Sequence, residues 1–319
     1  MKLSKILALI LGIIIFVLIV KTIGIEELVE ILKGFKIIYL PIIILILLLD
    51  YILAGLNTWL IASSFRKISL KNIIKATYIV LVYAAITPGK IADLLMIPLL
   101  KKEKLTLSQS TITVGLDKII SLFIKVFFGL VGAIFILKKF DFLFLGVPLI
   151  ALFIIILTIT LLKSKKFLNF VKNKLLKKYA FLFKGFNKDL KNSIKNNKKY
   201  ITYNFLVTIF KTFLEALLFF FLFLAFGQST SIIIIFFMFS LLSVILLLTF
   251  PIGISGIGVR ELVGIIVFGA IGVNSAVVFN SFILRIALIY LINLFTIFIY
   301  KNELNVLKGS KVFKRIKTE

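Results

Sequence analysis

The sequence contains neither cysteine nor histidine. Without cysteine it can form no disulfide and no thiolate metal site, and without histidine it lacks the commonest general base and metal ligand. Acidic residues are also few, with 13 Asp and Glu against 39 Lys and Arg, and none of them forms an aspartate-rich motif of the kind that holds Mg²⁺. These absences exclude most enzyme templates, and we expect no metal, no cofactor and no catalytic residue.

Charged residues of any kind are scarce. They make up 16% of the 319 residues, whereas 61% are hydrophobic. A soluble domain of this length could not cover so much apolar material with polar surface, so the composition indicates a polytopic membrane protein. In such a protein the net charge of +26 indicates lysines in cytoplasmic loops that face anionic lipid, and not a nucleic-acid partner.

Apolar runs divide the chain into transmembrane segments. A helix needs ~20 residues to cross the ~30 Å hydrocarbon core, and clear candidates lie at 3–20, 37–62, 107–137, 142–162, 201–226, 231–250 and 277–300. A weaker span lies at 72–87, and two short segments at 91–100 and 256–273 adjoin prolines and glycines. The first run resembles a signal peptide but lacks a small-residue cleavage site, so we expect it to remain as a helix.

The pattern therefore predicts an all-α, polytopic transmembrane helix bundle with about eight full spans and two short, Pro/Gly-broken segments. We treat 1–319 as a single transmembrane domain. Loop charges set its orientation, because positively charged loops stay in the cytoplasm. The connector 163–200 holds thirteen lysines and the tail 301–319 is basic, whereas 227–230 and 272–276 carry no charge. We therefore expect a multi-pass protein of the cell membrane with both termini cytoplasmic.

The lysine-rich connector 163–200 also has apolar residues at helical spacing, including Val171, Leu175, Tyr179 and Leu182. This pattern predicts an amphipathic helix that lies in the inner membrane interface. The alternative is a solvated loop whose apolar residues are incidental.

Two segments interrupt the apolar helices in a similar way. One reads TPGKIADLLMIP at 87–98 and the other TFPIGISGIGVRELVG at 249–264, half the chain apart. In hydrocarbon every backbone polar group must be paired, so such a break is tolerated where it is buried in protein or lines a polar cavity. The freed N–H groups at the start of a half-helix suit a phosphate or carboxylate. The alternative is that both segments are ordinary loops at the membrane surface.

The two breaks belong to a weak internal repeat, 37–137 and 201–300. Asp50 precedes Pro88 by nearly the same interval as Glu215 precedes Pro251. The loop charges orient the span before the first break from inside to outside and the span before the second from outside to inside. The sequence therefore predicts inverted-topology repeats, an arrangement in which transporters place a binding site near the bilayer midplane.

Ten ionisable residues lie in or beside the spans. Each costs ~2.5–3.5 kcal/mol at the centre of a membrane helix, so such residues normally face an interior and find partners. They are Asp50, Asp93, Asp117, Lys118, Lys125, Lys211, Glu215, Arg260, Glu261 and Arg285. Lys211 and Glu215 are spaced to neutralise each other on one helix face, whereas the adjacent Asp117 and Lys118 need separate partners.

The two arginines are the strongest ligand candidates. A planar guanidinium suits a pair of phosphodiester oxygens, and Glu261 and Glu215 are the expected counter-ions when no ligand is bound. Ligand contact and internal ion pairing both remain open for each arginine. The candidate substrate-binding residues are Arg260, Glu261, Arg285, Pro251, Gly253, Gly256, Gly258, Pro88, Gly89, Lys90, Asp93, Asp117 and Lys118, with Asp50 and Glu215 as candidate coupling or counter-ion residues.

These motifs carry a family resemblance. TPGKIADLL resembles the signature Pro-Gly-x-x-(Gly/Ala)-(Glu/Asp), and FPIGISGIGVRE resembles Pro-x-Gly-x-Gly-Gly-x-Gly-x-Arg-Glu. Both belong to the flippase-like membrane family related to the transmembrane region of lysylphosphatidylglycerol synthases. Ser255 stands where the family commonly has glycine, and Asp93 replaces the more usual glutamate.

The resemblance implies a protein that binds, and moves across a prokaryotic cell membrane, an anionic phospholipid or a polyprenyl-phosphate-linked lipid. In the synthases an aminoacyltransferase domain follows this region, and since the chain stops 19 residues after its last span, we expect no aminoacyl transfer. Two alternatives remain. One is an intramembrane lipid transferase, and the other is a non-transporting membrane partner of a separate lipid-modifying enzyme or glycosyltransferase.

Overall fold

A computed structural model describes residues 3–86, 91–137, 142–163, 188–191, 193, 197–248 and 256–301. Within these ranges the chain is helical and contains no strand. The prediction of an all-α membrane helix bundle is therefore confirmed. The predicted interfacial helix lies mostly outside the described residues, and so do the centres of both Pro/Gly breaks.

The helices follow the apolar runs of the sequence closely. The first half contains α1 (Leu3–Ile23), α2 (Ile25–Lys33), η1 (Ile37–Tyr39), α3 (Leu40–Ser63), α4 (Leu70–Ile86), η2 (Ile91–Leu95), α5 (Met96–Lys102), α6 (Leu107–Val131), η3 (Gly132–Leu137), η4 (Phe142–Gly146) and α7 (Val147–Lys163). The second half contains α10 (Lys198–Ala225), α11 (Ile232–Leu248), α12 (Val259–Gly269) and α13 (Ser275–Ile299). The short helix α2 was not predicted, because three acidic residues interrupt its apolar pattern.

In the part of the chain that the structure describes, three helical segments are long and apolar enough to cross a membrane, namely Ile37–Ser63, Lys198–Ala225 and Ser275–Ile299. Shorter apolar helices lie at Ile10–Ile23, Phe144–Leu157 and Ile232–Leu247. Large apolar side chains remain exposed on the outer faces, and Phe298 on α13 is 74% exposed. Such a surface suits contact with lipid tails and not with water.

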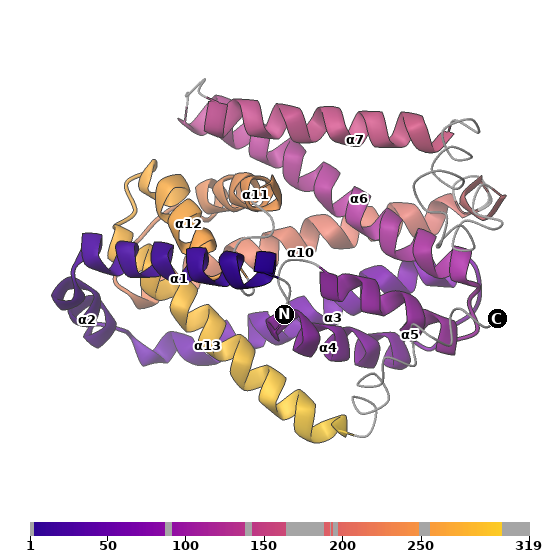
Figure 1. The fold of residues 1–319 in the computed structure, drawn as a ribbon, viewed down its shortest axis with the longest axis horizontal. Coiled ribbons are helices and arrows are strands. Elements are labelled where there is room, and N and C mark those ends of the chain that lie inside the picture. Colours follow the sequence, from indigo (N-terminus) through magenta and orange to yellow (C-terminus); the bar gives the residue numbers. More distant parts are fainter. Residues whose placement is uncertain are drawn as a thin grey trace.

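Helices α3 and α10 form an antiparallel pair at the centre of the bundle (Figure 1). Tyr39 at the start of the pair lies against Phe221, Asp50 contacts Lys211, and Asn57 donates a hydrogen bond to Thr208. Residue numbers thus rise along α3 as they fall along α10. Because of this pairing, polar residues from the two halves of the sequence meet in the interior.

Two further helix pairs join the halves. Helix α6 packs closely on α11, where a Cβ at Gly129 would lie 3.1 Å from the Leu241 Cα, so glycine suits the close approach of the two backbones. Helix α4 packs on α13, where the Tyr290 hydroxyl donates to the Ala85 carbonyl. The contacts of Lys75 with Tyr300 and of Ala85 with Tyr290 make this pair antiparallel as well.

Local capping fixes where several of these helices begin. Thr106 and Gln109 form a reciprocal capping box at the start of α6, and the Asn274 side chain accepts from two backbone N–H groups at the start of α13. Phenylalanines fill the core where α10, α12 and α13 meet, with Phe219, Phe223, Phe268 and Phe282 all fully buried.

Candidate functional site

Four charged side chains from three helices form what we name the central ion cluster: Asp50 on α3, Lys125 on α6, and Lys211 and Glu215 on α10. Lys211 Nζ lies 3.0 Å from Asp50 Oδ1 and 2.5 Å from Glu215 Oε1. Lys125 Nζ lies 2.8 Å from Glu215 Oε2. The predicted pairing of Lys211 with Glu215 is therefore confirmed, and it extends to α3 and α6.

One expectation for this cluster was wrong. Glu215 was expected to balance an arginine, but both of its oxygens contact lysines. The reason is the parallel packing of α6 and α10, in which Asp117 lies by Asn204 and Lys125 reaches the same carboxylate that Lys211 contacts from one turn away. The spacing in the sequence could have indicated Lys125, because it follows Lys118 by two helical turns and so lies on the same face of α6.

Arg260 and Glu261 stand in the first turn of α12, directly after the second break. Glu261 is completely buried, and its Oε2 accepts a hydrogen bond of 2.6 Å from the Gly258 N–H. Its other oxygen lies 3.6 Å from Arg260 Nε, too far for a hydrogen bond. Gly258 has a φ of 89°, which a residue with a Cβ rarely adopts. Glu261 therefore fixes the backbone at the end of the break and only partly neutralises Arg260.

Arg285 on α13 faces the same interior. Its guanidinium lies 5.9 Å from the centre of the Phe219 ring, and that of Arg260 lies 6.0 Å from the centre of the Phe282 ring. Arg285 interacts electrostatically with Asp50 and with Arg260. Among the described residues, neither Arg260 Nε nor Arg285 Nε has a hydrogen-bond partner, although both atoms are buried. Donors of this kind cost free energy unless a ligand or water satisfies them.

A second polar group lies between α3, α6 and α10 toward the other end of the bundle. Asn204 donates to the Asn57 carbonyl at 2.9 Å and to Asp117 Oδ1 at 3.3 Å. Lys118 instead forms an ion pair with Asp93 of η2 at 2.9 Å. The prediction that Asp117 and Lys118 need separate partners is confirmed. Asn57 and Asn204 were missed because they are uncharged, and a search for asparagines in apolar spans would have found them.

The ten ionisable residues contain equal numbers of cations and anions, but not all of them form ion pairs. Five are cations and five are anions, and the described contacts couple Lys118, Lys125, Lys211 and Arg260 to carboxylates. Within the described part of the chain, Arg285 alone of these five cations has no carboxylate within ion-pair distance. Of the five carboxylates, Asp117 has no described cation at that distance, and it lies in the second polar group. The interior near Arg285 is therefore locally positive.

Several predicted site residues can be placed and others cannot. Arg260, Glu261 and Arg285 lie around one interior, with Asp50 and Glu215 of the central ion cluster beside them. Asp117 lies in the second polar group, whereas Asp93 and Lys118 form a separate ion pair. Gly256 and Gly258 both have positive φ at the end of the second break. Pro88, Gly89, Lys90, Pro251 and Gly253 fall outside the described residues. The described part contains no group of three acidic residues placed to hold a metal ion.

The fold and these buried ion pairs define an all-α integral membrane protein with a charged interior. The chain belongs to the family described as the lysylphosphatidylglycerol synthase transmembrane region, which it matches over residues 5–296. The family expected from the two break motifs is thereby confirmed. No curated protein and no solved structure matches the chain.

Proposed function

We propose that this protein binds the anionic headgroup of a membrane lipid at Arg260 and Arg285 and moves that lipid between the two leaflets. The observation that carries the proposal is the locally positive interior, in which Arg285 has no carboxylate partner among the described residues and both guanidinium groups keep an unused buried donor. An anion that reaches this interior gains charge-assisted hydrogen bonds without displacing an existing ion pair of Arg285. The lipid class expected is a phospholipid or a polyprenyl-phosphate-linked lipid.

The arrangement of helices supports inverted repeats over 37–137 and 201–300. Suppose that α3, α4 and α6 of the first repeat are equivalent to α10, α11 and α13 of the second. The contact of α4 with α13 is then equivalent to the contact of α11 with α6. Both contacts are present in the structure, and both helix pairs are antiparallel. It also converts the α5–α6 contact into the α12–α13 contact. The equivalent helices α3 and α10 run in opposite directions, as inverted repeats require and parallel repeats do not.

Inverted repeats explain how a lipid could be reached from either leaflet. Two halves of opposite orientation can rock against each other around a fixed midplane site, so that the site opens to one side and then to the other. The central ion cluster crosses the α3–α10 contact between the halves, and it would have to rearrange in such a movement. We assign the protein to the cell membrane with both termini in the cytoplasm. The family match concerns the transmembrane region, so it gives no reason to expect aminoacyl-transfer chemistry.

The proposal is tested with purified protein in liposomes that contain a fluorescent phospholipid. Dithionite, which bleaches only the outer leaflet, reports movement of an anionic lipid and of a zwitterionic lipid with the same acyl chains. We expect the anionic lipid to move faster than the zwitterionic one, and Arg285→Met to abolish this difference. Arg66→Met is the control and should keep it, because Arg66 is exposed in the connection between α3 and α4. If the folded protein moves neither an anionic phospholipid nor a polyprenyl phosphate, the proposal that it transports lipid is wrong. Lipid that binds without moving would favour the partner-subunit alternative.

A further inference from the structure

A groove of about 490 Å³ runs between α4 and α13 on the lipid-facing side of the bundle. Val82 and Ala85 line it from α4, and Tyr290, Asn293 and several aliphatic side chains line it from α13. The lining is almost entirely apolar, and Leu291, Leu294 and Ile297 are exposed at its outer edge. In a membrane these faces meet hydrocarbon, so a lipid chain is the occupant that the position of the groove favours.

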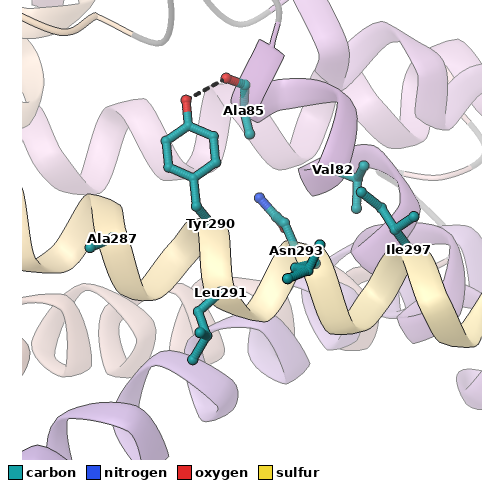
Figure 2. A pocket seen from close by; sticks show the side chains of 8 residues that line it. Val82, Ala85, Ala287, Tyr290, Leu291, Asn293 and Ile297 are labelled. Carbon is teal, nitrogen blue, oxygen red and sulfur yellow. Dashed lines mark hydrogen bonds between the residues drawn. The ribbon is translucent and has the colours of Figure 1, made fainter.

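One polar residue interrupts this apolar lining. Asn293 is 4% exposed, and both its amide nitrogen and its amide oxygen are buried without a hydrogen-bond partner in the described structure. Figure 2 shows its amide extending from α13 on the same side as the Tyr290 ring, toward the end of α4. Tyr290 already has a partner, because its hydroxyl donates to the Ala85 carbonyl at 3.0 Å. Asn293 is therefore the unsatisfied polar side chain of the groove.

The two unused groups of Asn293 restrict what could bind there. An ether or ester oxygen only accepts, so it would satisfy the amide N–H and leave the carbonyl oxygen unpaired. A hydroxyl group both donates and accepts, and a single lipid hydroxyl can satisfy both kinds of group on one asparagine. A site that hydrogen-bonds a hydroxyl rejects the analogue without it more strongly than an apolar site does, because the buried polar groups are then left unpaired.

The groove and the proposed headgroup site share helix α13, which carries both Asn293 and Arg285. Arg285 and Asn293 lie on the same helix about two turns apart, which is ~12 Å along its axis. A lipid whose phosphate lies near the arginines could therefore place a hydrocarbon chain in the groove.

We propose that the α4–α13 groove is a lipid-chain site in which Asn293 hydrogen-bonds a lipid hydroxyl, so that this residue selects hydroxyl-bearing lipids over matched lipids that lack the group. This inference rests on the proposed function in one respect: the phosphate of the same lipid is taken to lie at Arg260 and Arg285. The hydroxyl could belong to a polyol headgroup or to a free position of the glycerol backbone.

Paired lipids test this selection in the purified full chain. Native mass spectrometry measures competition between phosphatidylglycerol and phosphatidylpropanol, which share charge and chains and differ only in hydroxyls. A second pair, diacylglycerol and its methyl ether, lacks phosphate. We expect the wild-type protein to prefer the hydroxyl-bearing member of at least one pair by about tenfold. Preference in the first pair alone assigns the hydroxyl to the headgroup, and preference in the second assigns it to the backbone.

Two variants locate the effect. Asn293→Leu should abolish the preference without lowering the thermal stability, because it removes two unsatisfied polar atoms and keeps a similar volume. Asn280→Leu, on the same helix, removes a hydrogen bond to the Leu28 carbonyl far from the groove, and it should lower stability while keeping the preference. Equal binding within both pairs by the wild-type protein overturns the proposal, and so does a preference that survives Asn293→Leu.

The same assay separates this site from the headgroup site. Arg285→Met should reduce the preference for anionic over zwitterionic lipid while leaving the hydroxyl preference in place. If no lipid moves in liposomes but the hydroxyl preference is present and depends on Asn293, the proposed transport fails and the groove site stands. If lipid moves but the hydroxyl preference is absent, the groove site fails and transport stands.

Discussion

Lys211 of α10 lies 3.0 Å from Asp50 of α3, inside the contact between the two halves of the sequence. The same lysine contacts Glu215 on its own helix, so a single ammonium group serves two carboxylates. In an apolar interior such an arrangement adds little net stability over apolar side chains, but the loss of one partner is costly. It also fixes the register of α3 against α10.

We expect Lys211→Met to destabilise the protein by about 3–5 kcal/mol, because it leaves Asp50 as a buried charge without a cation. The double variant Asp50→Asn, Lys211→Met should recover much of this loss. Lys118→Met is the matched control, since Lys118 also pairs with an aspartate but its side chain is 50% exposed, so the loss of this less buried pair should cost less. Thermal unfolding in detergent measures all three. A double variant as unstable as Lys211→Met would contradict the explanation.

The second prediction concerns the two glycines at the end of the second break. Gly256 and Gly258 both have positive φ, so alanine at either position costs about 1–2 kcal/mol in backbone strain. A Cβ at Gly258 would also lie 2.2 Å from the Gly12 carbonyl oxygen of α1, whereas among the described atoms none lies within 4 Å of a Cβ at Gly256. Gly258→Ala should therefore lower the unfolding temperature more than Gly256→Ala. Equal losses would show that α1 does not constrain this turn.

The third prediction separates the two roles of Glu261. Glu261→Ala removes both the acceptor for the Gly258 N–H and the negative charge beside Arg260, and it should destabilise by about 1–3 kcal/mol through the orphaned buried donor. Glu261→Gln keeps an acceptor for Gly258 but releases Arg260. Added anionic lipid should then raise the unfolding temperature of Glu261→Gln by more than that of the wild-type protein, because at a given concentration a ligand that binds the folded state more tightly stabilises it more.

A smaller or equal response to anionic lipid in Glu261→Gln would contradict the assignment of Arg260 to the headgroup site. The zwitterionic lipid with the same chains serves as the control. It should stabilise the variant and the wild-type protein equally.

The fourth prediction tests the polar group between α3, α6 and α10. Asn204→Leu leaves the Asp117 carboxylate and the Asn57 carbonyl without their shared donor, so it should cost about 1–3 kcal/mol. Asn72→Leu is the control, because the Asn72 side chain bonds Glu103 at an exposed position and surface changes stay within about 0.5 kcal/mol. Unfolding temperatures that fall equally in both variants would mean that the buried hydrogen bonds of Asn204 add no stability.

The sequence predicted the helices well because membrane helices follow directly from apolar runs. The spans at 37–62, 201–226 and 277–300 agree with the observed helices within three residues at either end, and the short segments beside the breaks were also found. The interior position of the ionisable residues followed from their cost in lipid. Their partners were predictable only within one helix, as for Lys211 and Glu215, where the spacing of four residues places both on one face.

By itself, then, the sequence determined the fold class, the positions of the helices and the motifs of the family, because these depend on local composition and on the thickness of a bilayer. The tertiary structure decided which charges meet. It brought Lys125 to Glu215, kept the two arginines apart from that carboxylate, and left Arg285 without an anionic partner among the described residues. Those outcomes depend on how α6, α10 and α13 pack, and packing between distant segments is set by the shapes of many side chains together, which no local pattern encodes.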